Sequence, residues 1–171
     1  MGGHTDIVEL ENAAVAKLGV SASGCTLLDV GCGTCHRLSD TVADIAVGVD
    51  IRPDLLEQGP SGIPRVAGDL RALPFASLTF DIVWCRLMLG HVREMEAAYS
   101  ELSRVCCMGG IVIVSALSTE GEMHELEPFA HTIERQAVAA YDVGLRLEKR
   151  QDVVVDPSVS VRALLWRKNA T

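Results

Sequence analysis

Two glycines and an aspartate, each placed after an apolar segment, carry the clearest chemical signal in this chain of 171 residues. Gly31 and Gly33 follow the apolar run that begins at Thr26, and Asp50 ends a second apolar run nineteen residues after Gly31. A strand that enters a Gly-x-Gly turn and opens a helix brings bare backbone close to a ligand. A carboxylate at the end of the next strand can accept hydrogen bonds from ribose hydroxyls. The spacing therefore predicts a cofactor that contains a ribose.

The sixth position of the glycine pattern separates two candidate cofactors. A nicotinamide dinucleotide fingerprint needs a glycine there so that the helix can approach a pyrophosphate, but this position is His36. The run from Asp29 to Thr34 instead resembles the first motif of class I S-adenosylmethionine-dependent methyltransferases, in the small-molecule group called methyltransferase type 11 or UbiE-like. The resemblance implies S-adenosylmethionine as the cofactor and S-adenosylhomocysteine as the product.

Further segments resemble the motifs of this family in the order in which the family has them. They are Gly48–Ile51 for the acidic second motif, Gly68–Leu70 with Leu73–Phe75 for the adenine-binding turn, Phe80–Val83 for the fourth strand, and Glu101–Val105 with Gly109 and Gly110 for the helix and turn before the fifth. The likeness covers roughly residues 25 to 117. One departure is Cys35, which stands where the family often has another glycine.

The resemblance also implies roles for individual residues. Asp50 is expected to bind the ribose diol, Ile51 to pack on adenine, and Asp69 with the Leu70 backbone to bind the adenine amino edge. Asp29 is expected to orient the glycine turn and to accept from the methionine ammonium through water. The remaining positions are expected to bring backbone to the cofactor: Gly31, Cys32, Gly33, and Cys85 at the end of the fourth strand. A packed core thiol is the alternative interpretation of Cys85.

The acceptor side offers one candidate catalytic residue. His91 follows the fourth strand, where related enzymes commonly keep a histidine, and an imidazole that titrates near neutrality can take the proton of a hydroxyl acceptor. A histidine that only packs or caps a helix is the competing interpretation. His124, His131 and the glutamates at positions 120, 122, 125 and 127 lie where such enzymes often place substrate loops. An oxygen, a nitrogen or a carbon acceptor is compatible with these residues.

The cysteines allow a second kind of chemistry. Cys32, Cys35 and His36 match both a haem-attachment pattern and a redox dithiol at the start of a helix, where the helix N-terminus could lower the pKa of the Cys35 thiol. Covalent haem attachment would need export, for which the sequence has no signal, and a redox dithiol would not explain Asp29, Gly31 or Asp50. A dithiol redox protein is therefore one alternative function, and a binding or scaffold protein of the methyltransferase fold is another. No metal site is predicted, because no second Cys-x-x-C pair completes a set of four ligands.

Composition limits the partners. A net charge of −8 with only three lysines argues against nucleic acid. The longest apolar stretch, Ile111–Leu117, is too short to span a bilayer, and the first residues lack a basic region followed by an apolar segment. We therefore expect a cytoplasmic enzyme without a membrane partner, acting on a small metabolite or natural-product intermediate.

The hydrophobic pattern predicts alternating strands and helices in a single domain, residues 1–171. Strands are expected at residues 25–30, 45–50, 64–67, 79–85 and 110–116, and a C-terminal hairpin at residues 145–155 and 159–167. Helical stripes are expected at Ile7–Leu18, Val92–Cys106 and Phe129–Tyr141. Together with the resemblance, this predicts an α/β, Rossmann-like, doubly wound sheet of seven strands, mostly parallel with an antiparallel edge hairpin, and helices on both faces.

Three parts of the domain have expected roles. Residues 1–24 form a helix over the cofactor site, residues 25–117 the cofactor-binding core, and residues 118–171 a substrate-side loop, helix and hairpin. Only some 24 residues precede the first strand, which leaves little room for a lid. An open pocket suits an acceptor presented by a carrier or a peptide, and a homodimer would be another way to close the site.

Overall fold

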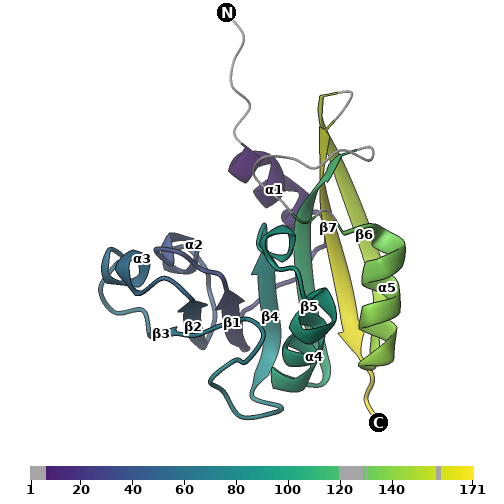
Figure 1. Ribbon diagram of the computed structural model, residues 1–171. Coiled ribbons are helices and arrows are strands. Elements are labelled where there is room, and N and C mark those ends of the chain that lie inside the picture. Colours follow the sequence, from purple (N-terminus) through teal and green to yellow (C-terminus); the bar gives the residue numbers. More distant parts are fainter. Residues whose placement is uncertain (1–6, 120–128, 130, 157–158) are drawn as a thin grey trace, which may run out of the picture.

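The computed structural model describes residues 7–119, 129, 131–156 and 159–171. Within these ranges one sheet has the strand order β3-β2-β1-β4-β5-β7-β6 (Figure 1). Its parallel strands are β1 (Thr26–Val30), β2 (Ile45–Asp50), β3 (Arg65–Ala67), β4 (Phe80–Arg86) and β5 (Cys106–Thr119), and the antiparallel edge is β7 (Val159–Lys168) with β6 (Leu145–Asp156). The predicted fold class is confirmed. The strand order reverses between β1 and β4.

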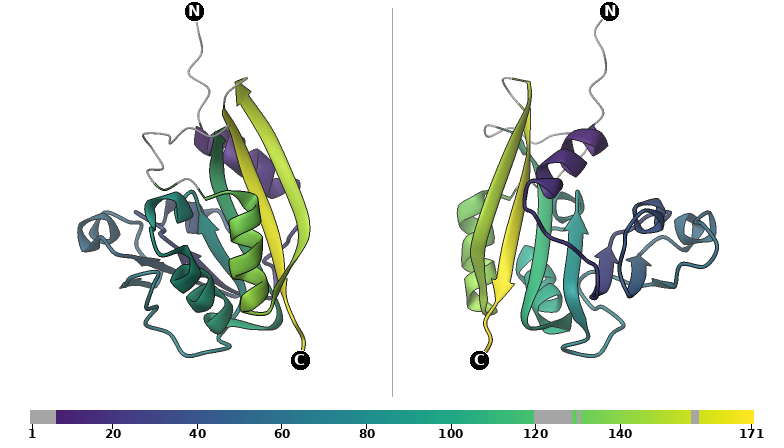
Figure 2. Two further views of the ribbon diagram at one scale, coloured as in Figure 1. Left: turned by 45° about the vertical axis from the view of Figure 1, so that its right-hand side comes forward. Right: turned by 180° about the vertical axis from the view of Figure 1, so that it is seen from behind.

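Helices cover both faces of the sheet (Figure 2). On one face lie α4 (Met95–Val105) and α5 (Ile133–Asp142), and on the other lie α1 (Ile7–Ala16) and the short α2 (His36–Ser39) and α3 (Pro53–Glu57). Successive side chains of a strand point to opposite faces. In β1, therefore, Leu28 and Val30 pack in the core under α4, whereas Leu27 packs with residues of α2 and α3. Asp29 shares the face of Leu27.

The connection from β3 to β4 has no helix, and two side chains of α4 hold it in place. Glu101 accepts a hydrogen bond from the Leu73 amide at 2.7 Å, and Arg104 donates to the carbonyl oxygens of Leu73 and Phe75 at 3.0 and 2.8 Å. At the start of the connection the Gly68 amide donates to the Asp50 carbonyl at 2.9 Å. These bonds keep residues 69–71 beside the end of β2.

Several expected boundaries and faces differ from the structure. β5 begins at Cys106, so the last position of the predicted α4 stripe belongs to a strand. In α5 the most buried residues are Gln136, Ala139 and Ala140, while Tyr141 of the predicted stripe is 56% exposed. The polar Gln136 is accommodated because its Oε1 accepts from the buried Tyr99 hydroxyl at 3.0 Å.

The N-terminal helix packs on the C-terminal half of the sheet. Ile7, Leu10, Ala14 and Leu18 join a cluster with residues of β5 and β7, so the predicted apolar face is confirmed. Glu11 of the same helix is also fully buried, which the hydrophobic pattern did not predict. No helix among the described residues is long and apolar enough to cross a membrane.

Candidate cofactor-binding site

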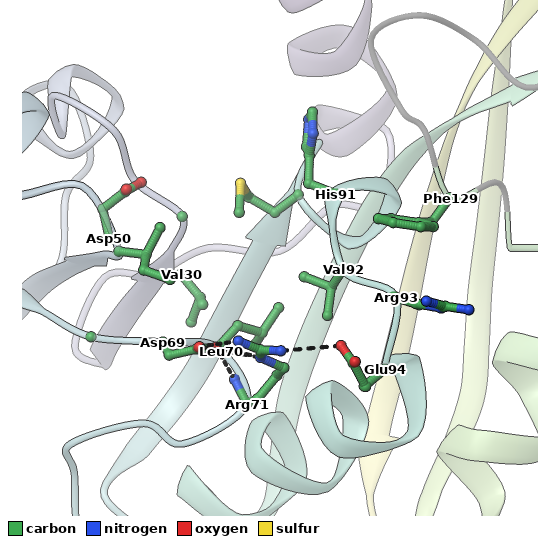
Figure 3. Close-up of a pocket in the computed structure, with 14 residues that line it drawn as sticks. Val30, Asp50, Asp69, Leu70, Arg71, His91, Val92, Arg93, Glu94 and Phe129 are labelled. Carbon is green, nitrogen blue, oxygen red and sulfur yellow. Dashed lines mark hydrogen bonds and ion pairs between the residues drawn. The ribbon is translucent and has the colours of Figure 1, made fainter.

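A cavity of about 390 Å³ lies at the carboxyl ends of β1 and β2, beside the point where the strand order reverses (Figure 3). Doubly wound sheets bind ligands in such crevices. Six residues predicted as site residues line it: Gly31, Asp50, Ile51, Asp69, Leu70 and His91. Gly68, which belongs to the turn predicted to bind adenine, also lines it. Seven more lining residues are not among the predicted site residues: Val30, Arg71, Met88, Val92, Arg93, Glu94 and Phe129.

The glycine turn is fastened to the end of β2 by backbone hydrogen bonds. The amides of Gly31 and Cys32 donate to the carbonyl oxygen of Val49 at 2.7 and 3.1 Å. Gly31 and Gly33 have φ angles of +72° and +54°, a conformation that side chains with a Cβ rarely adopt. Gly31 of this turn lines the cavity without a side chain of its own.

Asp50 is held in a fixed orientation with acceptor capacity left over. Its carboxylate is 6% exposed; Oδ2 accepts from the Gly33 amide at 2.8 Å and Oδ1 from the Arg52 amide at 2.9 Å. An ionised carboxylate offers about four lone-pair sites. Each oxygen therefore retains room for one hydroxyl of a ribose diol. Ile51, 60% exposed beside it, supplies apolar surface in the same wall.

Asp69 already has a cationic partner. Its carboxylate receives Nη2 and Nε of Arg71 at 2.7 and 3.1 Å, and Arg71 Nη1 reaches Glu94 at 3.2 Å (Figure 3). Hydrogen bonds from Arg71 hold the pKa of Asp69 below its ordinary value. The adenine amino group would therefore compete with Arg71 for the Asp69 carboxylate. Hydrogen bonding of adenine to the Leu70 backbone would not involve this competition.

The wall beside β4 is built from side chains. A Cβ placed on Gly31 would lie 2.0 Å from Cγ of Met88, so the Met88 side chain covers the bare turn. His91 lies in the short 3₁₀ helix η1 (Leu89–His91); it is exposed and its ring points away from Arg71 and Glu94 (Figure 3). The Phe129 ring is directed into the cavity (Figure 3).

Among the histidines after β5, the structure describes His131. Its Nε2 forms a hydrogen bond with the Val92 carbonyl oxygen at 2.8 Å, so it packs against the cavity-lining segment. His124 and the four glutamates at positions 120 to 127 lie outside the described residues.

Four predicted site residues lie outside the cavity lining: Asp29, Cys32, Gly33 and Cys85. The backbone amide of Gly33 donates a hydrogen bond to the Asp50 carboxylate, which does line the cavity. The Cys85 side chain is fully buried in the core under α4. Asp29 is 1% exposed, its Oδ2 has no hydrogen-bond partner among the described residues, and burial raises its pKa to about 7.

The two cysteines of the turn contact each other. Their sulfur atoms are 2.7 Å apart and occupy the space left by Gly48 of β2, where a Cβ would lie 2.4 Å from Cys35 Sγ. Burial raises the pKa of both Cys32 and Cys35. The expectation of a lowered pKa for Cys35 is therefore wrong, because the thiol is enclosed by the fold. Among the described residues, no cluster of three or more His, Cys, Asp or Glu side chains could hold a metal ion.

The fold is a doubly wound domain with a cavity at the carboxyl ends of β1 and β2. A family model described as a methyltransferase domain matches residues 28–114. The chain belongs to this methyltransferase-domain family.

Individual proteins show the same relationship. The malonyl-[acyl-carrier protein] O-methyltransferase of Herminiimonas arsenicoxydans is 35% identical over 128 residues, which are 72% of this chain and 48% of that protein. The demethylmenaquinone methyltransferase of Mycobacterium sp. (strain KMS) is 35% identical over 107 residues, 61% of this chain and 46% of that protein. The chain spans about half the length of the curated relatives it matches. The crystal structure of the [4+2]-cyclase SpnF shares the fold, with a TM-score of 0.79 at 17% identity over 95% of this chain and 81% of that one.

Proposed function

We propose that this chain binds S-adenosylmethionine in the cavity at the ends of β1 and β2 and transfers its methyl group to a small acceptor. The observation that carries the proposal is Asp50: a buried carboxylate in the cavity wall, fixed by two backbone amides and with one acceptor position left on each oxygen. That arrangement suits a ribose diol. The family membership supports methyl transfer as the reaction.

The bound cofactor would supply a methyl group that is already activated on a sulfonium. The residues of the chain therefore need mainly to orient the two reactants and to exclude water. Asp50 fixes the ribose, Ile51 and the Leu70 backbone bind adenine, and the Gly31 turn admits the rest of the cofactor. Asp29, which lies outside the cavity lining, accepts from the ammonium of the methionine portion through water.

The acceptor binds on the side of η1 and Phe129. The names of the two relatives refer to malonyl on an acyl carrier protein and to demethylmenaquinone. The first supports an acceptor presented by a carrier, and the second supports an acceptor with an apolar body. Apolar lining from Met88, Val92 and Phe129 suits such a body. His91, at the rim, would act as a base only for a hydroxyl acceptor. A cytoplasmic location and closure of the site by a homodimer belong to the same proposal.

Calorimetric titration with S-adenosylmethionine and S-adenosylhomocysteine tests the proposal, using the wild type, Asp50→Ala and the control Asp54→Ala. Asp54 is an exposed carboxylate in the first turn of α3, paired with Arg52. We expect micromolar binding to the wild type and to Asp54→Ala. Asp50→Ala should bind at least ~100-fold more weakly, because two hydrogen bonds to a charged acceptor contribute roughly 1.5–3 kcal/mol each. A wild type that binds neither ligand would exclude the proposal.

A second candidate function is dithiol redox chemistry, favoured by the contact between the Cys32 and Cys35 sulfur atoms. The raised pKa of both thiols opposes it, since the thiolate is the reactive form. Replacement of both cysteines by serine separates the two functions.

A further inference from the structure

A carboxylate of α1 lies where an amphipathic helix normally buries an apolar residue. Glu11 is fully buried, and Oε1 accepts from Arg86 Nε at 2.7 Å and from the Ser115 hydroxyl at 2.6 Å, while Oε2 accepts from Arg86 Nη2. Arg37 of α2 is a second cation, with Nη2 3.7 Å from Oε2. Buried charges occur where they are paired. Glu11 of α1 is therefore an ion-pair partner of two guanidinium groups, that of Arg86 on β4 and that of Arg37 on α2.

The same network fixes the point where the chain leaves β4. Arg86 is the last residue of that strand. Leu87 follows with a φ of +53°, and its amide donates to both the carbonyl and the hydroxyl oxygen of Ser115, at 2.9 and 3.1 Å. Ser115 is thus bonded to Glu11 and to Leu87. The segment that continues to Met88 and His91 starts from a backbone position that this network holds.

Asp29 lies beside this network without joining it. It pairs in register with Trp84, and the Arg86 guanidinium lies 5.0 Å from the centre of the Trp84 ring. Arg37 and Arg86 are close enough to lower the pKa of Asp29, yet no hydrogen bond joins either to it among the described residues. A guanidinium next to an ionised carboxylate ordinarily forms a two-point pair with it. Here Arg86 forms its two-point pair with Glu11 instead of Asp29.

We propose that Glu11 is a positioning residue of the cofactor site: it holds Arg37 and Arg86 so that Asp29 keeps an oxygen for the ammonium group of the cofactor. Arg37 and Arg86 pair with Glu11 and also act on Asp29, and Asp50 adds a third carboxylate close enough to act on Asp29. When Asp29 is ionised, these three carboxylates and two guanidiniums carry one negative charge in excess. A cationic group complements that charge. This inference rests on the proposed function, because it concerns the same cofactor.

The charges around Asp29 give the inference a measurable signature. Burial is the largest cause of its raised pKa; Glu11 on α1 and Asp50 on β2 raise it further, and Arg37 on α2 and Arg86 on β4 lower it. The thiols of Cys32 and Cys35 lie on the adjoining turn and have raised pKa values themselves. Because an ammonium prefers the ionised carboxylate, affinity for S-adenosylhomocysteine should fall roughly 30-fold from pH 8.5 to pH 5.5, with its midpoint near pH 7.

The test is the pH profile of S-adenosylhomocysteine affinity for Glu11→Gln, with the exposed Glu9→Gln on the same helix as control. Glu11→Gln removes a negative charge and releases the guanidiniums towards Asp29. The midpoint should move to lower pH, and affinity at pH 8.5 should fall about tenfold. Arg37→Gln should move the midpoint in the opposite direction, and Asp29→Asn should abolish the pH dependence. Glu9→Gln should match the wild type.

A merely structural role for Glu11 would lower the melting temperature and leave the midpoint of the folded protein unchanged, which would overturn the inference. If Glu11→Gln does not fold, the pH profile of S-adenosylhomocysteine affinity for Arg37→Gln is the deciding measurement. An unchanged midpoint of this profile would overturn the inference, and an upward shift would support it. Failure of the wild type to bind S-adenosylhomocysteine at any pH would instead remove the proposed function, and the inference with it.

Discussion

The two walls of the cavity are built in different ways. The wall beside β1 and β2 combines the backbone of the glycine turn with Ile51 and with Asp50, whose carboxylate is fixed by the Gly33 and Arg52 amides. The wall beside β4 consists of side chains: Met88 over the turn, the exposed Glu94 paired with Arg71, and Phe129. Backbone bonds define the shape of the first wall, whereas rotamers define the second. Under the proposed function, the first wall binds the cofactor and the second binds the acceptor.

The largest expected effect concerns the buried carboxylate behind the first wall. Asp29 has a folded pKa of about 7 against an ordinary value of 3.8. The unfolded chain therefore releases this proton more readily, so the contribution of Asp29 to stability decreases as pH rises from about 4 to about 7 and stays low above that. Asp29→Asn should raise the free energy of unfolding at pH 8 by up to about 4 kcal/mol, while it weakens cofactor binding.

Urea denaturation at pH 4 and pH 8 measures this difference, with the exposed Asp44→Asn as control. Near pH 4 the two proteins should be nearly equal in stability, since Asp29 is protonated in the fold. Equal stability of the wild type and Asp29→Asn at pH 8 would show that burial of this carboxylate has no energetic consequence.

A Cβ at Gly31 in the first wall would clash with the Met88 side chain in the second. Gly31→Ala places a methyl group against Met88 and strains a backbone with φ of +72°. We expect a loss of about 1–2 kcal/mol in stability and about tenfold in S-adenosylhomocysteine affinity. Gly62→Ala is the matched control, because Gly62 has a φ of +85° and a Cβ added there would have no heavy atom within 4 Å. If both variants lose affinity equally, the contact with Met88 is irrelevant to binding.

Arg71 joins Asp69 to Glu94 and so connects the two walls of the cavity. Arg71→Gln frees the Asp69 carboxylate for the adenine amino group, so affinity should rise by a few-fold at most, because exposed ion pairs contribute about 0–1 kcal/mol. Arg52→Gln removes a comparable exposed pair with Asp54 outside the cavity lining and should change nothing. A large loss of affinity in Arg71→Gln would mean that Arg71 itself contacts the cofactor.

The smallest effect is expected for the cysteines. Replacing Cys32 and Cys35 together by serine should leave the fold intact and keep S-adenosylhomocysteine affinity within about threefold, since their thiols face Gly48 and lie outside the cavity lining. Calorimetry and thermal melting check this result. Loss of all function in the double variant would favour the redox alternative.

The sequence allowed the first wall to be predicted and only part of the second. Gly31 and Asp50 belong to local patterns, in which an apolar strand is followed by a turn or by a carboxylate. Such patterns can be recognised from the sequence alone. The pairing of Glu11 with Arg86 joins residues 75 positions apart, and no periodicity reveals it. The one local sign of this pairing in the sequence is a glutamate on the apolar face of a helix.

Other misses have equally physical causes. The hydrophobic pattern predicts that the buried face of α5 includes Tyr141, whereas the structure buries Gln136 instead. Hydrophobicity alone does not predict this, because Gln136 is buried through its hydrogen bond with the Tyr99 hydroxyl. The pKa of Cys35 was expected to fall from its place at a helix start, but enclosure by the fold outweighs the end of a four-residue helix. Both results depend on tertiary packing.

A crystal structure of the chain with S-adenosylhomocysteine tests the central claim most directly. The predicted result is adenosine in the cavity at the ends of β1 and β2, with both ribose hydroxyls within hydrogen-bond distance of Asp50. A ribose bound away from Asp50, or a ligand on another face of the sheet, would contradict the proposed site.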